Sequence, residues 1–240
     1  ALELVNQIKE IKEIKEIKEA GKRISPFTIA LSGGSTPRLL FSVLGDQYAS
    51  SVNWNNVHFF WVDERYVPPE GNESNFGMTN EALLSKINIP HGNVHRIKGE
   101  EDYDTEAERY SKEVNDFVRH KNGLPCFNVI LLGLGEDGHT ASIFPGNLKL
   151  FKSEKISEMA VNPVTGQKRI TLTGKVINNS ENIFFLVTGK SKASVVKSIL
   201  HKEIKGKQYP ALYVLPEDGR LFWYLDNDAG SLIEERSVKK

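Results

Sequence analysis

The sequence predicts an α/β fold, with a single domain over residues 1–240 built on a largely parallel sheet. Short apolar runs of strand type alternate with helical segments along the whole chain, and no low-complexity linker separates them. Three of these runs, at 57–62, 129–132 and 183–187, are almost continuously apolar. That composition is typical of strands whose two faces are both buried, as in a parallel sheet covered by helices.

Composition narrows the classes of function. Lys plus Arg and Asp plus Glu both number 31, so the formal net charge is zero and gives no electrostatic reason to expect nucleic acid or an anionic membrane as a partner. No apolar stretch approaches the roughly 18 residues of a membrane span, and we expect a cytoplasmic protein. The single cysteine, Cys126, precludes an internal disulfide and a cysteine-based zinc site, and we expect its thiol to be buried and unreactive.

The N-terminal segment carries a repeat, in which Ile-Lys-Glu occurs four times over residues 8–19. Because a helical turn takes about 3.6 residues, isoleucines at this spacing spread over half of a helix surface. We predict a surface helix over residues 1–21 that packs Leu4, Ile8 and Ile11 on the domain. The alternative is a coiled coil with a partner chain, which needs a seven-residue repeat.

The first predicted strand, 27–31, runs directly into Ser32-Gly33-Gly34-Ser35-Thr36-Pro37. Thr36 is a candidate N-cap and Pro37 suits the first helical position, so a helix is predicted from there through Leu44. Glycines allow the backbone close to an anion, and free N–H and hydroxyl groups supply donors. We therefore favour a phosphate cradle at 32–36 over a simple turn, although no Gly-Lys-Ser/Thr follows as in a P-loop.

Charged residues follow the second predicted strand, 57–62, at Asp63-Glu64-Arg65. Ligands of parallel α/β sheets gather at the carboxyl ends of the strands. Arg65 is therefore a candidate for phosphate recognition and Asp63 for a base or a hydrogen-bond organiser, the alternative being a surface salt-bridge cluster. Ser74 is predicted to cap a helix from Asn75 to about Lys86.

The remaining elements are predicted from their periodicity. Residues 103–121 form an amphipathic helix with His120 at its end, and 147–160 a loop or short helix. The pair His91 and His95 has helical metal spacing, but the intervening residues predict a loop and no metal site. The other predicted elements are strands at 169–173 and 183–187, a helix at 193–200, and strands at 211–215 and 221–225 with Asp218-Gly219 turning between them.

The stretch 127–146 joins an apolar run to a glycine-rich turn that contains G-x-G-x-x-G at 133–138. A dinucleotide fingerprint would open a long helix there, whereas Pro145 stops any helix soon after the turn. An aspartate two residues before a histidine, Asp137 before His139, can orient the imidazole as a general base. A packed histidine and an anion-binding glycine turn remain the alternatives.

Taken together, these motifs are similar to those of a known family. The chain resembles the 6-phosphogluconolactonase branch of the glucosamine-6-phosphate isomerase/6-phosphogluconolactonase superfamily. The matching motifs are SGGSTP at 32–37, VDERYVP at 62–68 with SNFGM at 74–78, GLGEDGHTASIFPG at 133–146, RITLT at 169–173 and TGKSK at 188–192. They span nearly the whole chain beyond the N-terminal helix.

The resemblance implies a three-layer α/β/α domain with a Rossmann-like central sheet. It also implies hydrolysis of 6-phosphoglucono-1,5-lactone to 6-phosphogluconate in the pentose phosphate pathway, without metal or cofactor. His139, with Asp137, would be the base that activates water. The implied substrate-binding and phosphate-binding residues are Ser32, Gly33, Gly34, Ser35, Thr36, Asp63, Arg65, Asn75, Arg169 and Lys192.

One position separates this branch from its sibling. Amino-sugar phosphate isomerase/deaminases resemble one another in carrying a glutamate five residues after the histidine, where this chain has Phe144. The sequence thus favours the lactonase, and the alternatives are a deaminase or a non-catalytic sugar-phosphate sensor. The expected partner is a small sugar-phosphate lactone, with the protein a monomer or weak homodimer.

Overall fold

A parallel central sheet organises the computed structural model, which describes residues 1–9, 26–202 and 209–233. Within these residues the sheet has six strands in the order β11-β10-β7-β1-β2-β4, and every neighbouring pair is parallel. The prediction of a largely parallel sheet is confirmed. The strands are β1 (Phe27–Leu31), β2 (Val57–Trp61), β4 (Val94–His95), β7 (Val129–Leu132), β10 (Asn182–Val187) and β11 (Arg220–Leu225).

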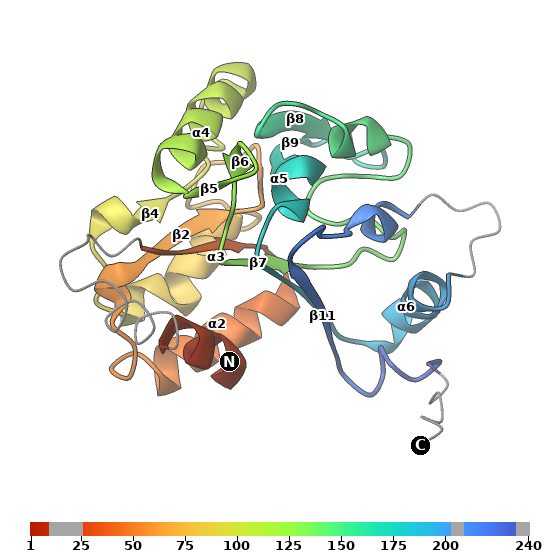
Figure 1. Cartoon of the computed structure of the whole chain (residues 1–240), viewed down its shortest axis with the longest axis horizontal. Coiled ribbons are helices and arrows are strands. Elements are labelled where there is room, and N and C mark those ends of the chain that lie inside the picture. The colour runs from red at the N-terminus through yellow and green to blue at the C-terminus, as the bar shows by residue number, and fades with distance from the viewer. Residues whose placement is uncertain (10–25, 203–208, 234–240) are drawn as a thin grey trace.

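Two layers cover the sheet, and Figure 1 shows it edge-on between them. One layer contains α2 (Ser35–Gln47), α3 (Asn75–Ala82) and the N-terminal helical residues 2–9. The other contains α4 (Tyr103–Phe117) and α5 (Gly174–Asn178), and α6 (Ala193–Leu200) lies beside β11. Short 3-10 helices occupy Trp54–Asn56, Leu84–Lys86, His91–Asn93, Leu148–Phe151, Lys190–Lys192 and Pro210–Tyr213.

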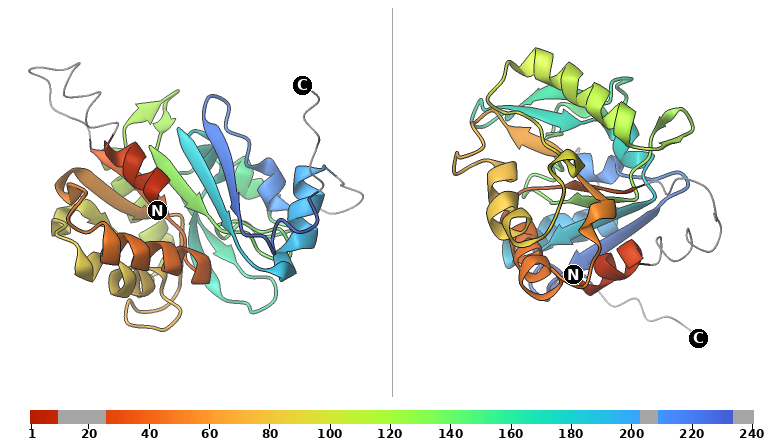
Figure 2. Two further views of the ribbon diagram at one scale, coloured as in Figure 1. Left: turned by 90° about the horizontal axis from the view of Figure 1, so that it is seen from below. Right: turned by 90° about the vertical axis from the view of Figure 1, so that its left-hand side faces the viewer.

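A second, antiparallel sheet was not predicted. It consists of β3 (Asp63–Arg65), β9 (Lys168–Leu172) and β8 (Ser157–Val161), and α4 packs over it in the right-hand view of Figure 2. Val62 links the two sheets, because its N–H donates to Leu31 O (2.8 Å) while its carbonyl accepts from Leu172 N (2.8 Å). The second sheet therefore starts where β2 ends, at the carboxyl edge of the first.

Several predicted elements need correction. The predicted strand at 211–215 is wrong, because Pro210 begins a 3-10 helix there. β11 then pairs parallel to β10, so Asp218-Gly219 does not close a hairpin. The segment 147–160, expected as loop or short helix, contains the 3-10 helix Leu148–Phe151 but also most of the strand β8. The predicted helix at 103–121 ends at Phe117, and His120 lies in a two-stranded hairpin of β5 (His120–Lys121) and β6 (Leu124–Pro125).

The start of the helix that follows the predicted phosphate cradle also differs from expectation. The helix α2 begins at Ser35, one residue after Gly34, whose φ of 111° is a conformation that favours glycine. Thr36 is therefore not the N-cap. Ser74, in contrast, caps α3 as predicted, with its hydroxyl accepting from Gly77 N at 3.0 Å.

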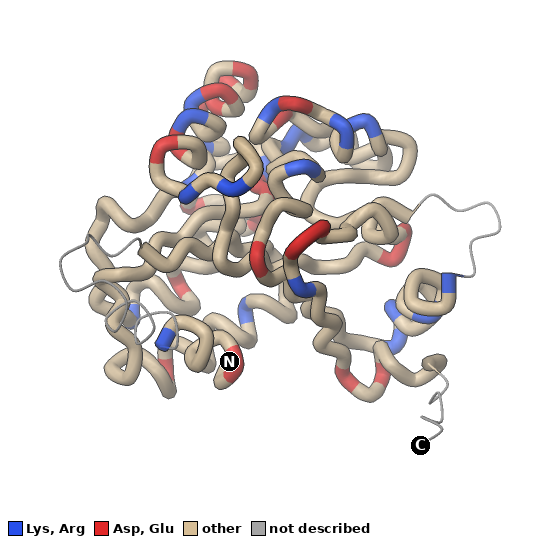
Figure 3. The backbone as a smooth tube through the Cα atoms, in the orientation of Figure 1, with Lys and Arg blue, Asp and Glu red and all other residues tan. Residues whose placement is uncertain are grey.

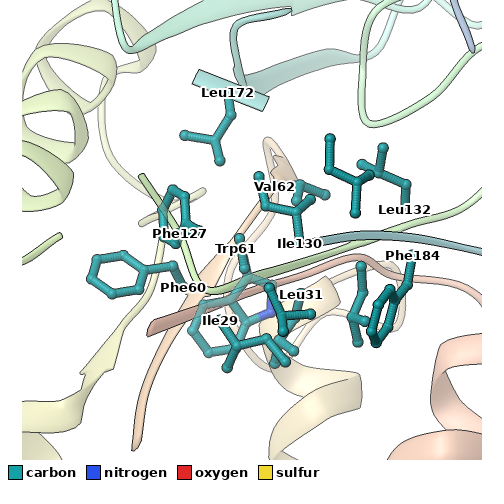
Figure 4. Packing of buried hydrophobic residues seen from close by; sticks show 14 of the residues in the cluster. Ile29, Leu31, Phe60, Trp61, Val62, Phe127, Ile130, Leu132, Leu172 and Phe184 are labelled. Carbon is teal, nitrogen blue, oxygen red and sulfur yellow. The ribbon is translucent and has the colours of Figure 1, made fainter. Parts of the chain in front are cut away.

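The core lies on both faces of the central strands, as the continuous apolar runs predicted. Every residue of β1 and β7 is buried. Figure 4 shows the rings of Phe60 and Phe127 beside each other, with their centroids 5.3 Å apart. Leu4 and Ile8 of the N-terminal helix are buried as expected, whereas Ile11 and most of the repeat lie outside the described residues. The thiol of Cys126 is buried, and burial raises its pKa.

Charges of both signs are interspersed over the chain trace, with blue and red segments alternating along α4 in Figure 3. This distribution matches the formal net charge of zero. Among the described residues, none of the helices has the length and hydropathy to cross a membrane.

Candidate functional site

A cavity of about 200 Å³ opens at the carboxyl edge of the central sheet. Parallel strands all end at this edge, so the loops that follow β1, β2, β7 and β10 converge there. Residues that the sequence placed in five separate motifs line the cavity together. They are Ser32, Gly33, Asp63, Arg65, Asn75, Gly133, Leu134, Gly135, His139, Ala141, Arg169 and Lys192.

His139 forms a hydrogen-bonded pair with Asp137 in the turn after β7. Nδ1 of the imidazole lies 2.6 Å from Asp137 Oδ1, which also accepts from His139 N at 3.1 Å. A carboxylate can only accept, so Nδ1 carries a proton, and in the neutral imidazole the lone pair is then on Nε2. Nε2 has no hydrogen-bond partner in the part of the chain that the structure describes. The pair has the geometry of an oriented general base.

Glycine makes this turn possible at two positions. A Cβ on Gly135 would lie 2.1 Å from His139 Nδ1 and 2.5 Å from Asp137 Oδ1. Gly138 has a φ of +80°, and a Cβ there would lie 2.2 Å from the ring of Tyr209. Gly138 O also accepts from Ala211 N at 3.0 Å. The glycines that resemble a dinucleotide fingerprint thus hold the histidine turn instead.

Asp63 is an internal hydrogen-bond hub, at 4% exposure. Its Oδ2 accepts from the Ser142 hydroxyl at 2.5 Å and lies 3.7 Å from Arg169 Nη1. Asn75 Nδ2 donates to Asp63 O at 2.9 Å and to Oδ1 at 3.3 Å. Both carboxylate oxygens are therefore engaged, and the arrangement suits a hydrogen-bond organiser better than a free base.

Three cations border the cavity from three different elements. Arg65 is the last residue of β3, and its Nη1 donates to Glu73 O at 2.5 Å. Arg169 comes from β9, and burial lowers its pKa against the opposing effect of Asp63. Lys192 Nζ lies 3.9 Å from Glu136 in the histidine turn. Together with Asp63 these side chains leave a positive excess that suits an anionic ligand.

Two buried polar atoms of the cavity wall have no partner among the described residues, Ser32 Oγ and Arg65 Nε. Leaving a buried polar group unpaired costs about 1–3 kcal/mol. A bound ligand with oxygen acceptors would satisfy both atoms.

Phe144 packs against the imidazole of His139, although it is not itself one of the residues that line the cavity. Its ring centroid lies 4.9 Å from that of His139, and the Arg169 guanidinium lies 5.6 Å from the ring. The side chain is 2% exposed. The position where a deaminase would need an acid thus holds a buried aromatic ring in direct contact with the imidazole.

Not all predicted site residues reach the cavity. Gly34, Ser35 and Thr36 are not among its lining residues, and the Thr36 hydroxyl instead bonds that of Thr188 at 2.7 Å. Asp137 lies behind His139. In the described residues, no group of three or more His, Cys, Asp or Glu side chains has a metal-holding arrangement.

Sequence reasoning missed Ser142 and the adjacent Ala141. Ser142 is fully buried and joins the histidine turn to Asp63. Ala141 has a φ of 49°, which non-glycine residues rarely adopt. Both residues belong to the motif at 133–146, but nothing local predicts that Ser142 reaches Asp63.

Comparison with known proteins shows which family the chain resembles over most of its length. The family model for glucosamine-6-phosphate isomerases/6-phosphogluconolactonase matches residues 3–223. The 6-phosphogluconolactonase of Haemophilus influenzae is 43% identical over 209 residues, covering 87% of this chain and 88% of that protein. The structure of the 6-phosphogluconolactonase from Trypanosoma brucei has a TM-score of 0.81 at 30% identity, covering 95% of this chain and 93% of that one. A monomeric glucosamine-6-phosphate deaminase, with a TM-score of 0.72 at 23% identity over 95% of each chain, shares the fold.

Proposed function

Because the chain belongs to the family of glucosamine-6-phosphate isomerases and 6-phosphogluconolactonases, we propose that it hydrolyses 6-phosphoglucono-1,5-lactone to 6-phosphogluconate. Relatives named 6-phosphogluconolactonase match most of its length. The observation that carries the proposal at the level of chemistry is the Asp137–His139 pair at the wall of a cationic cavity.

His139 acts as the general base in this proposal. Its Nε2 takes a proton from a water molecule, whose oxygen attacks the lactone carbonyl carbon. Asp137 accepts a hydrogen bond from Nδ1–H, at an N···O distance of 2.6 Å, and stabilises the imidazolium that forms. The ring C–O bond then breaks, and the imidazolium returns the proton to the departing ring oxygen. A lactone is already reactive, so positioning the water and the carbonyl supplies much of the rate.

The cations hold the substrate phosphate. Arg65 and Lys192 approach the cavity from β3 and from the segment after β10, and Arg169 borders it from β9. Ser32 Oγ and Arg65 Nε, unpaired in the described residues, gain acceptors from the bound substrate. Asp63 holds Arg169 at the cavity through their ion pair at 3.7 Å, and hydrogen bonds from Asn75 and Ser142 fix the Asp63 carboxylate.

Phe144 favours the lactonase over the deaminase. Ring opening and isomerisation of an amino-sugar phosphate need a second group for proton transfer, and the buried ring against His139 supplies none. Hydrolysis of a lactone needs only the one base.

The test is the rate of 6-phosphogluconolactone loss, corrected for spontaneous hydrolysis, with wild-type protein and His139→Ala. We expect the variant to lose about 10²–10⁴-fold in kcat, the usual contribution of a general base. Ammonia release from glucosamine 6-phosphate is measured in parallel. An unchanged kcat in His139→Ala would contradict the assigned base, and ammonia release by the wild type would favour the sibling activity.

A further inference from the structure

We propose that Glu64 is a positioning residue for substrate binding, which sets Asn75 and Arg65 in the cavity through the first turn of α3. The inference rests on the proposed lactonase function. Glu64 lies between Asp63 and Arg65 on β3, yet it does not line the cavity. At 2% exposure, its carboxylate has no salt-bridge partner among the described residues. A buried charge of this kind is tolerated only when hydrogen bonds satisfy it.

Four hydrogen bonds do so. Oε1 accepts from the backbone N–H groups of Arg65 and Asn75, both at 2.8 Å. Oε2 accepts from Phe76 N at 2.8 Å and from the Ser74 hydroxyl at 3.1 Å. Burial raises the pKa of this carboxyl, although the three backbone N–H groups oppose the shift.

Two of these donors, Asn75 N and Phe76 N, are the first two backbone N–H groups of α3, which lack partners inside the helix. The next N–H group of the helix, that of Gly77, donates to Ser74 Oγ at 3.0 Å. Glu64 and Ser74 together thus complete the helix start, and a negative charge there also suits the helix dipole. The carboxylate thereby joins the first turn of α3 to β3.

The position of this turn decides the geometry of two cavity residues. The Asn75 amide lies between Asp63 and Gly33, so closely that a Cβ on Gly33 would be 1.7 Å from Asn75 Oδ1. Glu73, just before the turn, holds Arg65 Nη1 through its carbonyl at 2.5 Å. A shift of the turn away from β3 would therefore move Asn75 and release Arg65 together.

The test is Glu64→Gln, whose amide group can accept on only one atom. We expect KM for the lactone to rise about tenfold, kcat to stay within about threefold, and the pH–rate midpoint to stay unchanged, because the Asp137–His139 pair is untouched. The matched control is Glu81→Gln, the same chemical change at an exposed position of α3. Its KM is expected to equal that of the wild type.

A double-mutant cycle with Asn75→Ala tests whether Glu64 acts through the turn. The effect of Glu64→Gln on KM should be smaller in the Asn75→Ala background than in the wild type. Effects that multiply independently, or an unchanged KM in the folded variant, would overturn the proposal. If Glu64→Gln fails to fold, Ser74→Ala removes one of the four bonds, and a smaller rise in KM is expected.

Amide hydrogen exchange separates this proposal from the function itself. In Glu64→Gln, or in Ser74→Ala, the amides of Asn75 and Phe76 should exchange faster than in the wild type. Unchanged exchange at both amides would overturn the positioning role whatever the activity. An inactive wild type with faster exchange in the variant would contradict only the proposed function.

Discussion

The task of a single cavity residue depends on which neighbours contact it. Asp63 illustrates this, because its carboxylate contacts Ser142, Asn75 and Arg169. It thereby holds three segments of the chain together. Lys192, in contrast, has one ion-pair partner among the described residues, the exposed Glu136 at 3.9 Å. A pair that weak leaves the ammonium group available to a phosphate.

At this scale we predict the effect of neutralising the proposed phosphate ligands. Arg65→Gln and Lys192→Gln should each raise KM about 10- to 100-fold with little change in kcat, because phosphate binding is largely shared by the ground and transition states. Lys190→Gln, an exposed lysine of the same 3-10 helix, is the control and should leave KM unchanged. Steady-state kinetics measure this, and a fall in kcat alone would require reassigning both side chains.

The histidine turn allows a second prediction for a single residue. Gly135→Ala places a methyl group 2.1 Å from His139 Nδ1, so the Asp137–His139 bond must break or the turn must move. We expect kcat to fall at least about tenfold while the protein remains folded, as followed by lactone hydrolysis and circular dichroism. Gly92→Ala is the control, because a Cβ there meets nothing within 4 Å. Wild-type activity in Gly135→Ala would show that the pair tolerates displacement.

Among the elements, α4 shows how a helix stabilises a sheet edge. The strand β4 has only two residues, so it ends before the backbone of Trp61 on β2. The buried hydroxyl of Tyr110 supplies the hydrogen bonds that a longer β4 would make, because it donates to Trp61 O at 2.7 Å and accepts from Trp61 N at 2.9 Å. One side chain of α4 thus completes the hydrogen bonding of β2.

Removing that hydroxyl should destabilise the fold. Tyr110→Phe leaves the N–H and the C=O of Trp61 buried without partners, and we expect the free energy of unfolding to fall by about 2–3 kcal/mol. Tyr103→Phe on the same helix is the control, since its hydroxyl has no hydrogen bond among the described residues, and a change below about 0.5 kcal/mol is expected. Urea denaturation measures both, and equal effects would contradict the assigned role.

At the scale of the whole molecule, contacts between two histidines and a glutamate join the edge of the central sheet to α4. His58 Nδ1 lies 2.8 Å from His95 Nε2, and His95 Nδ1 lies 2.6 Å from Glu113 Oε1. The other carboxylate oxygen, Glu113 Oε2, contacts Arg109 Nη1 at 3.1 Å. Burial, with the neighbouring His95, lowers the pKa of His58 to about 4. Burial also lowers the pKa of His95, although Glu113 opposes that shift.

The pH dependence of stability follows from these directions. Between pH about 6.5, the ordinary histidine pKa, and pH about 4, the unfolded chain binds more protons at these positions than the native protein. The contribution of these two histidines to the free energy of unfolding is fully present above pH about 6.5 and is lost as the pH falls toward about 4. We therefore expect the unfolding free energy to fall across this window, and His58→Gln to flatten the slope.

Urea denaturation at several pH values measures that slope. His91→Gln, the same change at an exposed histidine, should leave it unaltered. The same slope in His58→Gln and in the wild type would mean that other groups cause the loss of stability.

The local features of this protein were determined by the sequence alone. Apolar runs identified all the longer central strands, the Ser74 cap placed the start of α3, and the Asp137–His139 spacing identified the paired imidazole. These depend on residues close in the chain, whose periodicity and side-chain chemistry are visible in the sequence. The five motifs likewise identified most of the cavity wall.

Only the tertiary structure decided what distant segments do to one another. The switch at Val62 into a second sheet, the 3-10 helix at Pro210–Tyr213 and the engagement of Thr36 with Thr188 all depend on such contacts. Asp63 meets Ser142 across a separation of 79 residues, which no local pattern encodes. The burial of Glu64 has the same origin, because a glutamate between two charged neighbours looks exposed until α3 packs its first turn against it.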